Sequence, residues 1–229
     1  MRTVDSKRRS FTYSISEKRD YHTSELLVKD GQYQFNLHSP SATLENVSFG
    51  MPGLHNVENA VAAFAAVDQL GLTEDEIRNG LATYKGVKRR FDVHINTDKL
   101  VYIDDYAHHP TEISACIGSV RALFPGRRVK GIFQPHLFSR TKDHMSEFAS
   151  SLSALDEVTL LDIYPAREEP IPGVTSEVLL DRITLPEKEL QSKEAAVAAL
   201  STENLDVLLT MGAGDIDQLV SPIKKKLAS

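Results

Sequence analysis

The sequence predicts an α/β protein with a small strand-and-helix part, residues 1–88, followed by a larger domain with a mainly parallel sheet, residues 89–229. From Phe91 onward, apolar segments of strand length alternate with amphipathic segments of helix length, which is typical of βαβ units with right-handed crossovers. Before that point the strands come first and the helices afterwards. The basic link GVKRRF separates the two patterns, so we expect the domain boundary near Lys88.

Four segments near the start of the chain have the alternating or β-branched composition of short strands. These segments are FTYSIS, SELLVKD, QYQFNLH and ATLENVSFG. Asp30 and Gly31 lie between the second and the third segment and favour a tight hairpin turn. We therefore expect a small β-meander in this part of the chain.

Two helices are expected to follow the meander. Asn56 is the expected N-cap of the first, whose apolar residues recur at helical spacing until Gly71 ends it. Thr73 and Glu76 have the spacing of a capping box, and they predict a second helix that Gly86 ends.

The second domain is expected to alternate strands and helices to the end of the chain. The expected strands are FDVHIN, KLVYID, RVKGIFQ, EVTLLDIY, a short segment near Glu189 and DVLLTMG. The expected helices cover residues 110–124, 141–155, 175–183 and 193–201 and a terminal segment that begins at Asp215. Pro110 suits a first helical turn because its ring fixes φ and it has no N–H to leave unpaired.

The composition argues against several classes of protein. No apolar run approaches the roughly 20 residues that cross a bilayer, and no apolar segment follows the basic residues near Met1. We therefore expect a soluble, cytoplasmic protein without a targeting signal or a membrane partner. The net charge of −6 argues against general binding to nucleic acid. The single cysteine, Cys116, excludes an internal disulfide and is expected to be a buried apolar residue.

The stretch VYIDDYAHHPTE, residues 101–112, contains several side chains that can bind a ligand or transfer a proton. An apolar strand ends in Asp104 and Asp105, and His108 and His109 follow before a helix begins. Ligands of open α/β sheets bind beyond the carboxyl ends of the strands. Two carboxylates and two imidazoles at such a place could bind a metal, hold a nucleotide or relay a proton. The alternative is a polar corner in which the aspartates cap the backbone.

Three further strand ends carry polar loops, namely QPHLFSRT, DIYPAREEP and MGAGD. Four polar loops at one edge of a sheet favour a binding cleft. In the first of them Arg140 suits a carboxylate or a phosphate, and His136 lies four residues before it. Ser139 lacks the G-x-S-x-G elbow of the hydrolases. Gly212 and Gly214 precede a helix start, an arrangement that favours anions.

Two other groups of residues are open to two interpretations. Asn56 and Asn59 are three residues apart, and their side-chain amides could form hydrogen bonds with the edge of a heterocycle or cap the helix. Lys88, Arg89 and Arg90 could bind phosphate or belong to a solvated link. No G-x-x-x-x-G-K-[ST] motif occurs in the sequence, so any nucleotide chemistry needs its main phosphate cradle from elsewhere.

Six segments, taken together and in order, resemble the Mur ligase family of peptidoglycan synthesis. They are GLHNVENAVAA (53–63), GVKRRFD (86–92), DDYAHHPTEI (104–113), FQPHLFSRT (133–141), DIYPAREEPIPGVT (162–175) and GAGDI (212–216). The family has a domain for a UDP-sugar, a central P-loop ATPase and a Rossmann-like, doubly wound C-terminal domain. The resemblance implies that residues 1–88 are the end of the central domain and 89–229 the C-terminal domain.

The resemblance also implies a reaction. The FQPHLFSRT segment favours the member that joins L-alanine to UDP-N-acetylmuramate, through an acyl phosphate made with ATP. The UDP-binding domain, the P-loop and the Mg²⁺ ligands of the family lie outside this sequence. The chain is therefore expected to be a fragment that is inactive alone, because the rest of its polypeptide is missing.

The resemblance assigns roles toward ATP to four residues of this sequence. Asn56 and Asn59 would lie against the adenine, Arg90 would meet the phosphates, and Asp105 would meet the ribose. His108 would approach the reacting phosphate and the amine.

It assigns roles toward the amino acid to a second set. Arg140, with His136, would hold the carboxylate of L-alanine, and His108 and Arg140 are the expected catalytic residues. Tyr106 would shape the pocket, and Tyr164 and Arg167 would border it. The family often has a basic residue where Leu137 stands, so any contact of that residue with substrate is absent or is supplied by another residue.

Two other functions are compatible with these residues. A metal-dependent phosphoesterase would use side chains around the carboxylate pair, and the candidate ligands are Asp104, Asp105, His108, His109, His136 and Asp162. A module that only binds a nucleotide or an amino acid is the third hypothesis.

Overall fold

The computed structural model describes residues 10–29 and 32–227. The chain forms two compact units, Met1–Lys85 and Gly86–Ser229. The expected hairpin residues Asp30 and Gly31 lie outside the described residues. Among those that are described, no helix is both long and apolar enough to cross a membrane.

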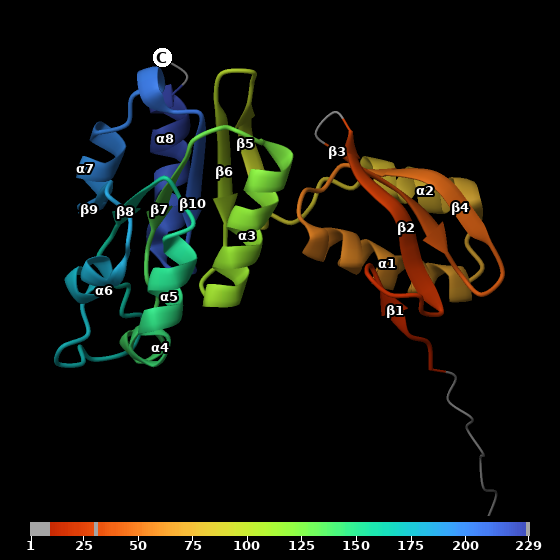
Figure 1. The fold of residues 1–229 in the computed structure, drawn as a ribbon, viewed down its shortest axis with the longest axis horizontal. Helices are drawn as coiled ribbons and strands as arrows, with labels where there is room; N and C mark the ends of the chain where they lie inside the picture. Colours follow the sequence, from red (N-terminus) through yellow and green to blue (C-terminus); the bar gives the residue numbers. More distant parts are fainter. Residues whose placement is uncertain (1–9, 30–31, 228–229) are drawn as a thin grey trace, which may run out of the picture. The chain divides into compact units, whose positions relative to one another are not determined.

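The first unit contains a four-stranded sheet (Figure 1). Its strands are β1 (Tyr13–Ser14), β2 (Tyr21–Lys29), β3 (Gln32–His38) and β4 (Thr43–Phe49), in that order across the sheet. The pairs β2–β3 and β3–β4 are antiparallel, as a meander requires, and β1 pairs in parallel with β2. All four expected strands are present, but the first is only two residues long.

Two helices, α1 (Leu54–Gln69) and α2 (Glu74–Thr83), complete the first unit. The expected capping box between Thr73 and Glu76 is confirmed. The prediction that Asn56 caps α1 is wrong, because the N-cap is Gly53, whose φ of 96° lets the chain turn earlier. The Asn56 amide donates instead to the Pro52 carbonyl, at 2.6 Å.

The second unit is built on a six-stranded sheet in the order β5-β6-β10-β7-β8-β9. The strands are β5 (Asp92–Asn96), β6 (Val101–Asp105), β7 (Val129–Phe133), β8 (Glu157–Leu160), β9 (Lys188–Leu190) and β10 (Val207–Met211). Only β5 is antiparallel to its neighbour, so the expected mainly parallel sheet is confirmed. Because β10 lies between β6 and β7, the loops that follow these three strands meet at one edge.

Helices cover both faces of this sheet, as a doubly wound domain requires. They are α3 (Pro110–Leu123), α4 (Phe138–Asp143), α5 (Met145–Leu152), α6 (Ser176–Arg182), α7 (Lys193–Ala198) and α8 (Val220–Leu227), with 3-10 turns η1 (Thr202–Asn204) and η2 (Asp215–Leu219). One apolar cluster joins the sheet to α3, α5 and α6, and another joins its opposite face to α7, η2 and α8.

The helix expected over residues 141–155 is two helices instead. The chain breaks at His144, whose φ of −119° and ψ of 23° are not helical, and α4 begins three residues earlier than expected, at Phe138. The break gives α4 its own direction at the end of the sheet where α3 also starts (Figure 1).

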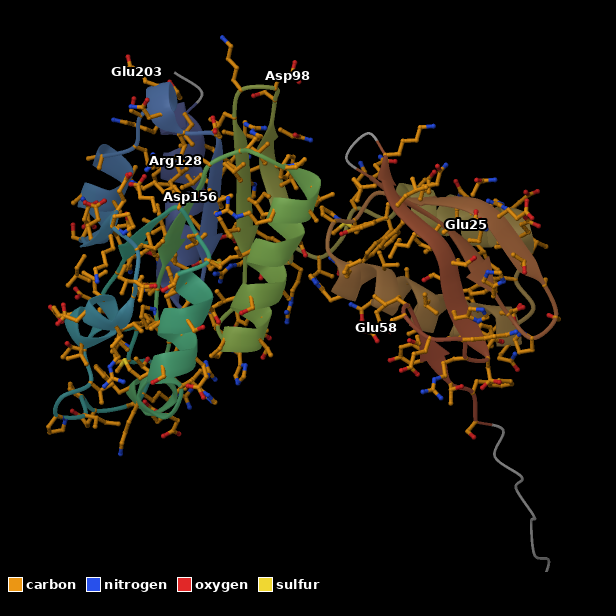
Figure 2. The ribbon with its side chains drawn as sticks, viewed as in Figure 1. Glu25, Glu58, Asp98, Arg128, Asp156 and Glu203 are labelled. Atoms are coloured by element: carbon orange, nitrogen blue, oxygen red, sulfur yellow. The ribbon has the colours of Figure 1, made fainter. Side chains whose placement is uncertain are left out.

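The two edges of the parallel strands differ in chemistry. At the amino-terminal edge, the side chains of Arg128 and Asp156 (Figure 2) are occupied by neighbours. Arg128 pairs with Glu157 and Glu187, and Asp156 accepts from the Val129 backbone N–H at 2.7 Å. The charged groups at that edge therefore tie neighbouring strands together.

Candidate functional site

Five predicted site residues gather at the carboxyl edge of the six-stranded sheet. Contacts between rings join Tyr106 to His108, His108 to His136 and His136 to Tyr164, with centroid distances of 5.2, 6.3 and 5.6 Å. The Arg140 guanidinium lies 3.2 Å from His136 Nδ1. The structure thus brings together residues from the loops after β6, β7 and β8, which are up to 58 positions apart in the sequence.

The loops after β7 and β8 are joined by backbone hydrogen bonds. His136 and Tyr164 form an isolated parallel bridge, and the Leu137 N–H donates to the Tyr164 carbonyl at 2.9 Å. Leu137 has a φ of 71°, a conformation that is strained for a residue with a side chain. Leu137, which stands where the family often has a basic residue, is therefore the residue at which the backbone turns into α4.

Glu168 holds the start of α4 from the neighbouring loop. Its carboxylate accepts from the Ser139 backbone N–H at 2.9 Å and from the Ser139 hydroxyl at 2.5 Å. The hydrogen bond from the hydroxyl, followed by the one from the backbone, lowers the pKa of Glu168. Because Arg140 follows Ser139 directly, Glu168 fixes the turn that carries Arg140. The sequence contained no signal for this role.

Burial lowers the pKa of His136, and the nearby charges of Arg140 and His108 act in the same direction. His136 is therefore a neutral imidazole near neutral pH. Arg167, which was expected to border this pocket, is exposed, and no hydrogen bond or ion pair links it to the cluster within the described part of the chain. Its predicted role stays a prediction.

Glu112 binds His108 and was missed as a functional residue. One carboxylate oxygen accepts from the backbone N–H groups of His108 and His109, at 3.0 and 3.2 Å, and lies 3.2 Å from His108 Nδ1. The spacing of His109 and Glu112 is that of an N-cap and its N3 residue, so capping logic could have found it.

Asp105 is buried and caps the backbone. Its two oxygens accept from the N–H groups of Phe91 and Ala107, each at 2.7 Å. Burial raises the pKa of Asp105 to about 6, although both backbone hydrogen bonds oppose the shift. The interpretation as a polar corner is thus correct for this carboxylate, and its predicted contact with a ribose stays a prediction.

Asp104 is fully buried and holds Arg89. It accepts from the Thr210 hydroxyl at 2.6 Å and from Arg89 Nε at 3.2 Å. Burial raises the pKa of Asp104, against the opposing effects of Thr210 and Arg89. Arg89 also donates to the Gly212 carbonyl at 2.6 Å, so it is a structural cation of this unit and not a solvated linker residue.

Arg90, the predicted phosphate ligand, lies between two anchored neighbours. The Arg89 carbonyl accepts from the Tyr106 N–H at 2.7 Å, and Asp105 binds the Phe91 N–H. The guanidinium carbons of Arg89 and Arg90 lie 5.0 and 5.6 Å from the centre of the Tyr106 ring. This stacking leaves the polar edge of Arg90 available for an anion.

The two glycines after β10 are explained by close packing. A Cβ atom on Gly214 would lie 2.5 Å from Gln134 Oε1 and 2.8 Å from the Tyr164 side chain. Gln134 Oε1 also accepts from the Ile216 N–H at 2.9 Å, so a backbone donor at the start of η2 is already occupied. The suggestion that this loop favours an anion therefore loses its main support.

Asn56 and Asn59 line a cavity within the first unit, between α1, α2 and β4. Its volume is about 390 Å³, and its lining is mostly apolar, with Phe64, Leu81 and Tyr84 among the larger side chains. A cavity of this volume with a mostly apolar lining is within the range of small-molecule sites.

The metal hypothesis is not supported by the geometry. Within residues 10–29 and 32–227, no group of three or more His, Cys, Asp or Glu side chains is placed to hold a metal ion. Asp104 and Asp105 are engaged as described above, and His109 Nδ1 lies 2.6 Å from the Thr111 hydroxyl. Cys116 is buried, as expected, and burial raises the pKa of its thiol.

Two family descriptions match the chain. The Mur ligase glutamate ligase domain matches residues 89–214, which is more than half of the chain, and the Mur ligase middle domain matches residues 2–67. The chain belongs to the Mur ligase family. The resemblance inferred from the six motifs is confirmed.

Several curated relatives of this Mur ligase chain share one name. The UDP-N-acetylmuramate–L-alanine ligase of Porphyromonas gingivalis strain W83 is 51% identical over 219 residues, covering 95% of this chain and 48% of the relative. The protein of that name from Parabacteroides distasonis is 46% identical over 219 residues, covering 96% and 47%. The chain therefore spans about half the length of the curated relatives it matches.

Solved structures of two ligases from one organism share its fold. The UDP-N-acetylmuramate–alanine ligase of Thermotoga maritima superposes with a TM-score of 0.79 at 24% identity, covering 94% of this chain and 47% of that one. The folylpolyglutamate synthase of the same organism superposes with a TM-score of 0.66 at 19% identity, covering 88% and 47%. The expected Rossmann-like fold of the second unit is confirmed by the first of these structures.

Proposed function

We propose that this chain is the second half of an ATP-dependent ligase that joins L-alanine to UDP-N-acetylmuramate. Residues 1–88 would be the C-terminal part of its central ATP-binding domain, and residues 89–229 its C-terminal domain. The shared name of relatives that are about half identical over nearly the whole chain supports this proposal. The observation that carries it is the cluster of His108, His136 and Arg140 at the carboxyl edge of the sheet.

Arg140 is suited to the carboxylate of the amino acid. A guanidinium presents five N–H donors in a planar fork that matches a carboxylate in a bidentate way. His136 takes one of those donors, and the Glu168–Ser139 contact fixes the turn from which Arg140 extends. A cation held in this way loses little freedom when an anion binds. Tyr106 and Tyr164 would form the apolar walls beside it, with Arg167 at the border.

ATP is the proposed second substrate. Asn56 and Asn59 would contact the adenine in the apolar cavity of the first unit. Arg90 would meet the phosphates, and Asp105 would meet the ribose through the lone pairs that its backbone hydrogen bonds leave free. Mg²⁺ would neutralise the charge on the phosphates. We expect its ligands and the P-loop outside this sequence, which has no P-loop motif.

The proposed reaction is catalysed by positioning and by charge neutralisation. ATP would phosphorylate the muramoyl carboxylate, and the amine of L-alanine would then displace phosphate from the acyl carbon. His108 would lie beside the reacting phosphate and the amine. A ligase of soluble precursors would work in the cytoplasm, without a nucleic-acid or membrane partner.

The proposal is tested by comparing two proteins. The complete reading frame that contains these residues should release phosphate only when UDP-N-acetylmuramate, ATP and L-alanine are all present. The 229 residues alone should show no turnover under the same conditions. Turnover by the 229 residues alone, or no dependence on L-alanine in the complete protein, would contradict the proposal.

A further inference from the structure

His108 and His136 face different kinds of neighbour through the same ring atom. Nδ1 of His108 lies 3.0 Å from the Tyr106 carbonyl oxygen and 3.2 Å from a Glu112 carboxylate oxygen. Nδ1 of His136 lies 3.2 Å from a nitrogen of the Arg140 guanidinium. The first nitrogen has two oxygen acceptors around it, and the second has a donor.

These neighbours determine where the ring protons lie. A carbonyl and an ionised carboxylate can only accept a hydrogen bond, so Nδ1 of His108 must carry a proton. A guanidinium can only donate, so Nδ1 of His136 must carry a lone pair. When both rings are neutral, His108 is the Nδ1–H tautomer and His136 the Nε2–H tautomer.

Glu112 is ionised in this arrangement. Burial raises the pKa of its carboxyl group, but the hydrogen bonds from the backbone of His108 and His109 and the interaction with the His108 ring outweigh burial, and the pKa is lowered. The same oxygen that faces the ring also accepts the two backbone N–H groups at the start of α3. The ring is therefore coupled to a rigid helix terminus.

We propose that Glu112 is a positioning residue that fixes His108 as its Nδ1–H tautomer and so leaves Nε2 as a hydrogen-bond acceptor for the amino group of the incoming substrate. Within the described residues, no hydrogen bond engages Nε2, and the ring is about one-fifth exposed, with 22% of the side chain accessible. His136 presents the opposite polarity, because its Nε2 carries a proton. The two rings, 6.3 Å apart, thus offer an acceptor and a donor side by side.

That the group bound by Nε2 of His108 is the amino group of the substrate rests on the proposed ligase function. The tautomers of the two rings do not depend on that function. They are measured without substrate, on the 229-residue chain, by ¹H–¹⁵N correlation NMR of the imidazole rings above about pH 8, where histidines are neutral. We expect a protonated Nδ1 for His108 and a protonated Nε2 for His136 in the same spectrum. A protonated Nε2 at neutral His108 would overturn the inference, whatever the enzyme proves to catalyse.

Three variants isolate the contribution of Glu112. Glu112→Ala removes the acceptor and should lower the Nδ1–H fraction of His108, because only the Tyr106 carbonyl remains. Glu112→Gln keeps an oxygen acceptor and should restore most of that fraction. Glu76→Ala removes the equivalent N3 carboxylate of the α2 capping box, in the other unit, and should leave His108 unchanged. A Glu112→Ala variant that is folded and has wild-type tautomers would refute the positioning role.

Discussion

The Glu168 carboxylate accepts two hydrogen bonds from Ser139, one from its backbone N–H and one from its hydroxyl. This contact joins the loop after β8 to the first turn of α4 and sets the direction of Arg140. Glu168→Ala should therefore loosen that turn. We expect the Ser139 amide to exchange with solvent several-fold faster than in the wild type, because its acceptor is gone.

The neighbouring carboxylate gives a matched control for this prediction. Glu169 is exposed and makes no hydrogen bond or ion pair within the described part of the chain. Glu169→Ala should leave the exchange of the Ser139 amide unchanged, and Glu168→Gln should give an intermediate rate. Equal exchange in the wild type and Glu168→Ala would show that α4 holds its first turn without help.

Gly214 should not tolerate a methyl group. Its Cβ would come within 3 Å of Gln134 and Tyr164, and overpacking of this kind typically costs about 1–3 kcal/mol. Gly118 lies within α3, and a methyl group there would point into open space, so Gly118→Ala should stabilise the chain by up to about 1 kcal/mol. Urea unfolding of both variants checks the pair. A Gly214→Ala chain as stable as Gly118→Ala would refute the packing argument.

Asp105 should give an unusual dependence of stability on pH. Its folded pKa of about 6 lies above the ordinary value of 3.8, so the folded chain binds the proton more tightly than the unfolded chain. The favourable contribution is present below pH 3.8 and is lost as the pH rises through 6. The cost of Asp105→Asn in unfolding free energy should therefore be smaller at about pH 7 than at about pH 4.5, by about 2 kcal/mol.

Asp156 provides the contrast. Burial raises the pKa of its carboxyl group, but the Arg121 side chain and the Val129 N–H outweigh burial, and the pKa is lowered. Its contribution is present above pH 3.8 and is lost only at lower pH. The cost of Asp156→Asn should thus stay flat between about pH 4.5 and 7. If the cost of Asp105→Asn increased with pH, the raised pKa of Asp105 in the folded chain would be contradicted.

Much of the fold follows from local rules that act on short segments. The capping box of α2, the proline at the start of α3 and the strand alternation of the second unit are encoded within a few residues of each feature, and the structure contains all three. The N-cap of α1 was misplaced because the positive φ of Gly53 is a conformation that sequence spacing does not reveal. The break at His144 likewise has no local signature.

The composition of the site was predictable, but its internal order was not. Tyr106, His108, His136, Arg140 and Tyr164 were expected together, because polar loops after neighbouring parallel strands share an edge. Some of the contacts around them come from separate loops, as when Glu168 of the loop after β8 binds Ser139 beside Arg140. The pairing of Asp104 with Arg89, for example, depends on a strand order that only the folded chain defines.

The central claim is that Arg140 binds the carboxylate of L-alanine in an ATP-dependent ligase, and steady-state kinetics of the complete protein test it most directly. Arg140→Lys removes the planar fork but keeps the charge, and it should raise the KM for L-alanine by about tenfold or more, the effect of about 1.4 kcal/mol, with the KM for ATP little changed. An unchanged KM for L-alanine, or an equal rise in the KM for ATP, would contradict the claim.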